Sequence, residues 1–175
     1  PGESYQRIAV DHFQINPTDG QGYQTLLKET FAEGGCTAIV HMWSLDSTLD
    51  GKLTSEELAQ EQNLGCRSVL NLTQAVLRTG WRQLPRLWLV TRGCQGVQHQ
   101  DTSIAVAPAP LWGLGQAIAR EHPELKCTRI DLSASATSAE RSNLARELQL
   151  EAPDEQIALR GEERYAGRLV RASFG

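Results

Sequence analysis

The sequence of 175 residues predicts an α/β fold in which a mainly parallel sheet has helices on both faces and ends in short C-terminal strands. Short apolar runs at 37–43, 86–92 and 125–132 alternate with segments of helical periodicity. The run at 37–43 is almost continuously apolar, which is typical of a strand that is covered on both faces. The alternation indicates right-handed crossovers between parallel strands. The length of the chain fits one domain over 1–175.

The N-terminal part predicts one helix. Residues 5–10 have weak strand character, and turn residues follow at 16–20. Asp19 can cap a helix over 21–33, because its carboxylate can accept hydrogen bonds from the first-turn amides. Glycines at 34–35 end this helix. Its apolar face consists of Tyr23, Leu26, Leu27 and Phe31.

The longest predicted helix follows a loop at 47–53. Thr54 or Ser55 can cap it, since acidic residues occupy its first turn, and the periodicity continues to Thr79. Its inner face consists of Cys66, Val69, Leu70, Thr73, Val76 and Leu77. After the next strand, 93–108 forms a long loop without an element of its own, and such loops are commonly functional or make contacts.

Prolines bound the next helix. Pro110 marks its start and Pro123 its end. Further on, Thr137 or Ser138 caps a helix that reaches Leu148. Two short strands are expected at 155–159 and 164–170.

Composition excludes several classes of protein. The net charge of −4 and the lack of a basic run argue against nucleic acid or an anionic membrane as the main partner. No apolar run is long enough for a membrane span, and no signal-peptide pattern is present. The four cysteines form no Cys-x-x-Cys pair and have no histidine at metal-ligand spacing. We therefore expect reduced, packed cysteines in a cytoplasmic protein without a metal site; they are Cys36, Cys66, Cys94 and Cys127.

Two glycine-rich segments are candidates for a dinucleotide site, which needs free amides at a strand-to-helix turn. Gly113 and Gly115 lie inside a predicted helix, and Ile118 takes the place of the third glycine. Close packing of that helix is the favoured interpretation of both glycines. The segment 93–96 follows a strand, but no helix begins there.

Reductase and hydrolase motifs are absent. A short-chain reductase needs a tyrosine with a lysine four residues later. None of the three tyrosines has one. The residue four positions after Tyr5 is Ala9, after Tyr23 it is Leu27, and after Tyr165 it is Leu169. A triad can be drawn from His41, Ser44 and Asp46, but a histidine that ends an apolar strand is more often a packed residue. No Gly-x-Ser-x-Gly elbow accompanies these residues.

Several segments nevertheless resemble, in order, the structural half of the ketoreductase domain of modular polyketide synthases. The run Ala-Pro-Leu-Trp-Gly-Leu-Gly at 109–115 carries most of the resemblance. The other segments are Asn-Pro at 16–17, His-Met-Trp-Ser-Leu-Asp at 41–46, Pro-Arg-Leu-Trp-Leu-Val-Thr-Arg-Gly at 85–93 and Glu-His-Pro-Glu-Leu at 121–125.

The resemblance implies a truncated Rossmann-like fold that supports a catalytic half. In that family the catalytic half holds NADPH and the Tyr, Ser and Lys that reduce a β-ketoacyl group on an acyl carrier protein. None of those positions maps onto this sequence, so no catalytic, cofactor-binding or metal-binding residue is expected in 1–175. The first strand, helix and strand of the family's structural half are also expected to be missing. The implied partners are the catalytic half, a neighbouring enoylreductase, dehydratase or methyltransferase, and indirectly the carrier protein.

Three alternatives remain. One is a degenerate pseudo-ketoreductase that acts as a scaffold beside a methyltransferase or an enoylreductase. An independent small nucleotide-binding domain would use 93–96 or 113–115 and would bind NADPH by itself. A stand-alone interaction domain would need no reductase half.

Overall fold

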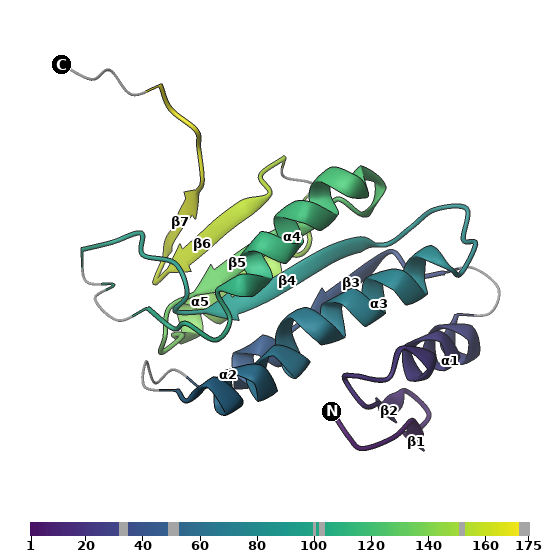
Figure 1. The fold of residues 1–175 in the computed structure, drawn as a ribbon. Helices are drawn as coiled ribbons and strands as arrows, with labels where there is room; N and C mark the ends of the chain where they lie inside the picture. Colours follow the sequence, from purple (N-terminus) through teal and green to yellow (C-terminus); the bar gives the residue numbers. More distant parts are fainter. Residues whose placement is uncertain (32–34, 49–52, 100, 102–103, 151–152, 172–175) are drawn as a thin grey trace.

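The computed structural model describes residues 1–31, 35–48, 53–99, 101, 104–150 and 153–171. A five-stranded sheet forms its centre, with the strands in sequence order (Figure 1). The strands are β3 (Ala38–His41), β4 (Arg86–Arg92), β5 (Thr128–Leu132), β6 (Gln156–Arg160) and β7 (Glu163–Ala166). The first four are parallel, and β7 pairs with β6 in the antiparallel direction. The predicted α/β fold with a mainly parallel sheet is confirmed.

The helices lie close to where the sequence predicts them. They are α1 (Gly20–Thr30), α2 (Ser55–Gln62), α3 (Ser68–Leu77), α4 (Pro110–Glu121) and α5 (Ser138–Glu147). A π-helical segment, Asn63–Arg67, joins α2 to α3, so the long predicted helix is continuous but irregular. Single turns of 3₁₀-helix, Trp43–Asp46 and Pro123–Leu125, follow β3 and α4.

Side chains of the predicted types cap three of these helices. The Asp19 carboxylate accepts a hydrogen bond from the Gln21 amide at 2.9 Å. Thr54 forms a reciprocal capping box with Glu57. The Thr137 hydroxyl accepts a hydrogen bond from an amide of the first turn of α5. Thr54 rather than Ser55 caps α2, and Thr137 rather than Ser138 caps α5.

Alternate residues of the strands face two separate cores, so the prediction of helices on both faces is confirmed. On one face, α3 and α4 pack on Leu87 and Leu89 of β4. On the other face, Leu144 of α5 packs on Ile130 and Ile157. Helix α1 packs beside α3 (Figure 1).

The prediction that all crossovers are right-handed is wrong for one of them. Strands β4, β5 and β6 advance in one direction across the sheet, but α4 and α5 lie on opposite faces. Two successive parallel crossovers with this arrangement must have opposite hands. Apolar side chains of β5 and β6 point to the face of the sheet opposite α4, and α5 packs on that face and buries them.

Strand β3 corrects a second prediction, because it is not covered on both faces. It is the edge strand of the sheet, Ala38 is exposed, and the Val40 side chain is 37% exposed. Its continuous apolar sequence therefore belongs to an open edge. On α3, Leu70 is 44% exposed whereas Leu72 is buried, so the inner face is centred one position away from the predicted stripe.

Smaller differences concern the ends of the chain and of β5. The weak strand at 5–10 is part of a hairpin of β1 (Gln6–Ala9) and β2 (His12–Gln14), of which β2 was not predicted. Strand β5 begins at Thr128 rather than at 125, because Lys126 has a φ of 43° and ends the preceding turn. Strand β7 ends at Ala166. Helix α1 ends at Thr30 rather than at 33, because Phe31 already leaves the helical conformation. Gly34, which was expected to end it, and most of the loop at 47–53 lie outside the described residues.

Candidate functional site

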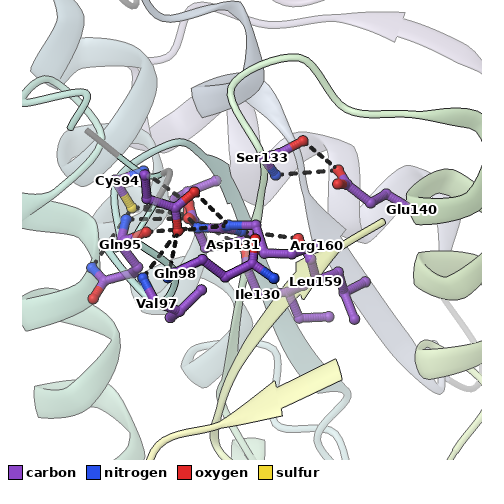
Figure 2. A network of polar contacts seen from close by, with 12 residues as sticks. Cys94, Gln95, Val97, Gln98, Ile130, Asp131, Ser133, Glu140, Leu159 and Arg160 are labelled. Carbon is purple, nitrogen blue, oxygen red and sulfur yellow. Dashed lines mark hydrogen bonds and ion pairs between the residues drawn. The ribbon is translucent and has the colours of Figure 1, made fainter. Parts of the chain in front are cut away.

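The carboxyl ends of β4, β5 and β6 meet at one edge of the sheet, which is where open α/β folds bind ligands. In this chain a buried polar network occupies that edge (Figure 2). The Asp131 side chain on β5 is completely buried. One terminal nitrogen of Arg160, the last residue of β6, lies 2.8 Å from an Asp131 carboxylate oxygen, and the other donates to the Asp131 carbonyl at 3.0 Å.

The Asp131 carboxylate also accepts hydrogen bonds from a hydroxyl and from two backbone amides. The Thr91 hydroxyl donates at 2.7 Å, and the backbone amides of Cys94 and Gln95 each donate at 3.1 Å. These two amides belong to the glycine-containing segment that the sequence offers as a phosphate loop. Because they point inward and bind a carboxylate of the same chain, they are not free to bind a phosphate. The Gly93 amide is also used, since it donates to the Leu132 carbonyl at 2.7 Å.

A second carboxylate fixes the rest of this loop to the sheet. Asp101 accepts hydrogen bonds from the amides of Val97 and Gln98 at 3.0 and 3.1 Å. Arg160 also donates to it at 3.1 Å and to the Gln95 carbonyl at 2.6 Å. Burial acts to raise the pKa of Asp101, but these amides and Arg160 together hold that pKa below its usual value. The network therefore anchors the first half of the long loop, from Cys94 to Asp101, to β5 and β6.

Cys94 lies inside the network as a buried thiol. Its Sγ is 3.1 Å from both the Thr91 hydroxyl and the Asp131 carboxylate. Burial, followed by the charge of Asp131, raises the pKa of the thiol to about 12. A thiolate is the reactive form, and at neutral pH this residue is a protonated thiol. Trp112 links α4 to the same group, because its indole nitrogen donates to the Thr91 hydroxyl at 3.0 Å.

Glu140 of α5 has a similar anchoring role beside the network (Figure 2). This side chain is 1% exposed. It accepts hydrogen bonds from the hydroxyl of Ser133 at 2.8 Å and from the amide of Gly161 at 2.7 Å. It thereby joins the turns that follow β5 and β6. The polar residues at this edge are bonded to one another, which is the arrangement of a structural network.

The triad drawn from His41, Ser44 and Asp46 does not form. The Nε2 atom of His41 is 2.7 Å from the hydroxyl of Ser68, and the Ser44 hydroxyl donates to the Val90 carbonyl at 2.7 Å. Burial lowers the pKa of His41 to about 4, so the ring is neutral at pH 7. The interpretation of His41 as a packed strand-end residue is confirmed.

The two glycines of α4 have different roles. A Cβ atom on Gly115 would lie 2.8 Å from both Arg129 Cδ and Leu89 Cδ1, so close packing is confirmed at this position. At Gly113 a Cβ atom would meet nothing within 4 Å, and the residue is exposed. The packing interpretation is therefore wrong for Gly113. Neither glycine stands at a strand-to-helix turn.

The remaining candidate residues are dispersed. The Tyr5 hydroxyl donates to Glu29, the Tyr165 hydroxyl donates to Glu163, and Tyr23 is buried in the core. All four cysteines are free. Within the described ranges, no group of His, Cys, Asp and Glu side chains could hold a metal ion. None of the helices among the described residues is long and apolar enough to cross a membrane.

Comparison with known proteins defines the class. A family model described as "Polyketide synthase extender module SpnB, Rossmann fold domain" matches residues 16–169. The chain belongs to this family and is a ketoreductase-related subdomain of a modular polyketide synthase.

Relatives of known sequence are much longer polyketide synthases. A phenolphthiocerol/phthiocerol polyketide synthase of Mycobacterium tuberculosis is 36% identical over 116 residues, which is 66% of this chain and 5% of that protein. The pikromycin synthase component PikAIII of Streptomyces venezuelae is 40% identical over 86 residues, or 49% of this chain and 6% of that protein. The chain thus corresponds to a small part of these relatives.

Solved structures agree on the fold. A C2-type ketoreductase from a modular polyketide synthase matches with a TM-score of 0.70 and 30% identity, covering 90% of this chain and 33% of that chain. A multidomain structure with adenylation, ketoreductase and pseudo Asub domains, from a keto acid-selecting NRPS module, matches with a TM-score of 0.82 and 25% identity. That match covers 94% of this chain and 14% of the other. The truncated Rossmann-like fold is therefore confirmed.

Proposed function

We propose that this chain is the non-catalytic, structural half of a polyketide synthase ketoreductase. It supports and positions a catalytic half that binds NADPH and reduces β-ketoacyl groups carried on an acyl carrier protein. The main support is the buried network at the carboxyl edge of the sheet. Asp131 fills the position where a cofactor phosphate would need free amides, and Arg160 is committed to two carboxylates.

The open edge of β3 supports the same proposal. An apolar edge strand with exposed Ala38 and Val40 is a site at which another strand can pair. In a half-domain that edge is the natural place for a strand from the remainder of the ketoreductase. The free cysteines support a reducing, cytoplasmic compartment for the assembly.

Reconstitution tests the proposal. We would mix the chain with a ketoreductase catalytic half from the same synthase and follow NADPH oxidation with a β-ketoacyl thioester. The catalytic half should be active only when the chain is present. Val40→Asp on the β3 edge should abolish the stimulation, whereas Val10→Asp on the exposed N-terminal hairpin should leave it intact.

Two outcomes separate the alternatives. A catalytic half that binds the chain but never oxidises NADPH would favour the pseudo-ketoreductase scaffold. A catalytic half that is equally active with and without the chain would contradict the proposed role.

A further inference from the structure

A pocket of about 340 Å³ lies between the C-terminal ends of α1 and α3, at the opposite edge of the sheet from the Asp131 network. The apolar part of its lining consists of Leu27, Phe31, Ala75 and Trp81. Two basic side chains, Lys28 and Arg78, form part of its lining, together with Gln24 and Thr79. Both basic residues are exposed, so this side of the pocket faces solvent.

The aromatic wall of this pocket is held in place from several sides. The Trp81 ring meets the Phe31 ring edge-on, with 6.0 Å between their centroids. Gly35 has a φ of 70° and packs so closely that an added Cβ atom would lie 3.0 Å from the Trp81 ring. The Trp81 amide also donates to the Thr79 hydroxyl at 3.3 Å. The pocket is therefore formed without a ligand.

Among the described residues that line this pocket, both charged side chains are basic, although the chain as a whole carries a net charge of −4. Within the part of the chain that the structure describes, neither Lys28 nor Arg78 has a side-chain hydrogen bond or an ion pair. Both stand at helix C-termini, where each helix end carries about half a negative charge. Each side chain carries a full positive charge, so the described part of the lining keeps a surplus of positive charge.

We propose that this pocket docks an acidic segment of a protein partner. A large apolar side chain of that segment enters the pocket and packs against Phe31 and Trp81, and flanking carboxylates pair with Lys28 and Arg78. A protein segment fits this pocket because the two basic side chains of its lining are exposed and can reach carboxylates that lie outside it. Protein docking sites commonly combine one buried apolar side chain with surrounding charged groups that pair with opposite charges on the partner.

A peptide titration followed by ¹⁵N NMR tests this inference. The probe is acetyl-Glu-Glu-Leu-Phe-Glu-Glu-amide, added to the complete 175-residue chain. We expect saturable shift changes centred on the Trp81 indole and on the amides of α1 and α3. Because exposed charges are screened by salt, the affinity should fall several-fold when about 0.5 M NaCl is added.

Charge reversal provides matched variants. The double change Lys28→Glu and Arg78→Glu should lower the affinity about tenfold while the remaining spectrum stays unchanged. Arg120→Glu is the control, because Arg120 is exposed in the last turn of α4 and lies outside the pocket. That variant should bind the peptide like the unchanged chain.

Three results would overturn the inference. The first is equal binding of the neutral peptide acetyl-Gln-Gln-Leu-Phe-Gln-Gln-amide. The second is unchanged affinity in the double variant. The third is tighter binding of sodium hexanoate than of the acidic peptide, which would make the pocket a site for small carboxylates.

Discussion

The guanidinium of Arg160 and the carboxylate of Asp131 lie 2.8 Å apart at the ends of two neighbouring parallel strands. The side chains of both are buried, and each has further partners within the same edge of the sheet. An ion pair of this kind contributes little when intact but is costly to break, because one charge is left buried alone. The pair thus ties the long loop after β4 to β5 and β6.

Removing Asp131 should therefore destabilise the chain strongly. We expect Asp131→Ala to lower the free energy of unfolding by about 3–5 kcal/mol, since Arg160 and two loop amides lose their acceptor. Urea unfolding followed by tryptophan fluorescence measures this change. Glu56→Gln on the exposed face of α2 is the control and should stay within about 0.5 kcal/mol of the unchanged chain. A loss for Asp131→Ala as small as that of the control would contradict the assigned role.

Replacing each of the two glycines of α4 with alanine should change the stability of the chain in opposite directions. Gly115→Ala should destabilise by about 1–3 kcal/mol, because the new methyl group overlaps Leu89 and Arg129. Gly113→Ala should stabilise by about 0.5–1 kcal/mol through helix propensity, since nothing lies near its Cβ position. Thermal unfolding of both variants compares them directly. A stabilising Gly115→Ala would show that α4 does not pack as closely as described.

His41 should make stability depend on pH. Its pKa is about 4 in the folded chain and 6.5 in the reference state, so the unfolded chain takes up a proton first. The stability that the neutral ring contributes is complete above pH 6.5 and is lost as the pH falls from 6.5 towards 4. The total is on the order of 3 kcal/mol.

Unfolding free energies measured between pH 7 and pH 4 check this prediction. His41→Gln should flatten the dependence, whereas His12→Gln, which changes an exposed residue, should keep it. An identical pH dependence in the His41→Gln variant would rule out this histidine as the cause.

The cysteines should fall into two classes of reactivity. Burial raises the pKa of Cys94 and of Cys127 to about 12, and both side chains are buried. Cys36 and Cys66 are half-buried, so they should react first with a thiol reagent at pH 7.5. Mass spectrometry after brief labelling identifies the modified residues. Rapid labelling of Cys94 would show that the network opens readily.

The sequence predicts elements well where local chemistry decides them. Asp19 and Thr54 cap helices as expected because a side-chain oxygen meets an amide a few residues away. The exposure of β3 could not be predicted, since an apolar run looks the same on an open edge and in a covered strand. The Asp131 network could not be predicted either, because Asp101, Asp131 and Arg160 share no local spacing. A signal was nevertheless present: Asp131 is a charged residue in an otherwise strand-like run.

The most direct test of the proposed structural role is calorimetric titration of NADPH into the chain alone, at about 100 μM protein. A non-catalytic half whose loop amides are already bound to Asp131 should give no saturable heat. Saturable binding in the micromolar range would contradict this account and would indicate an independent nucleotide-binding domain.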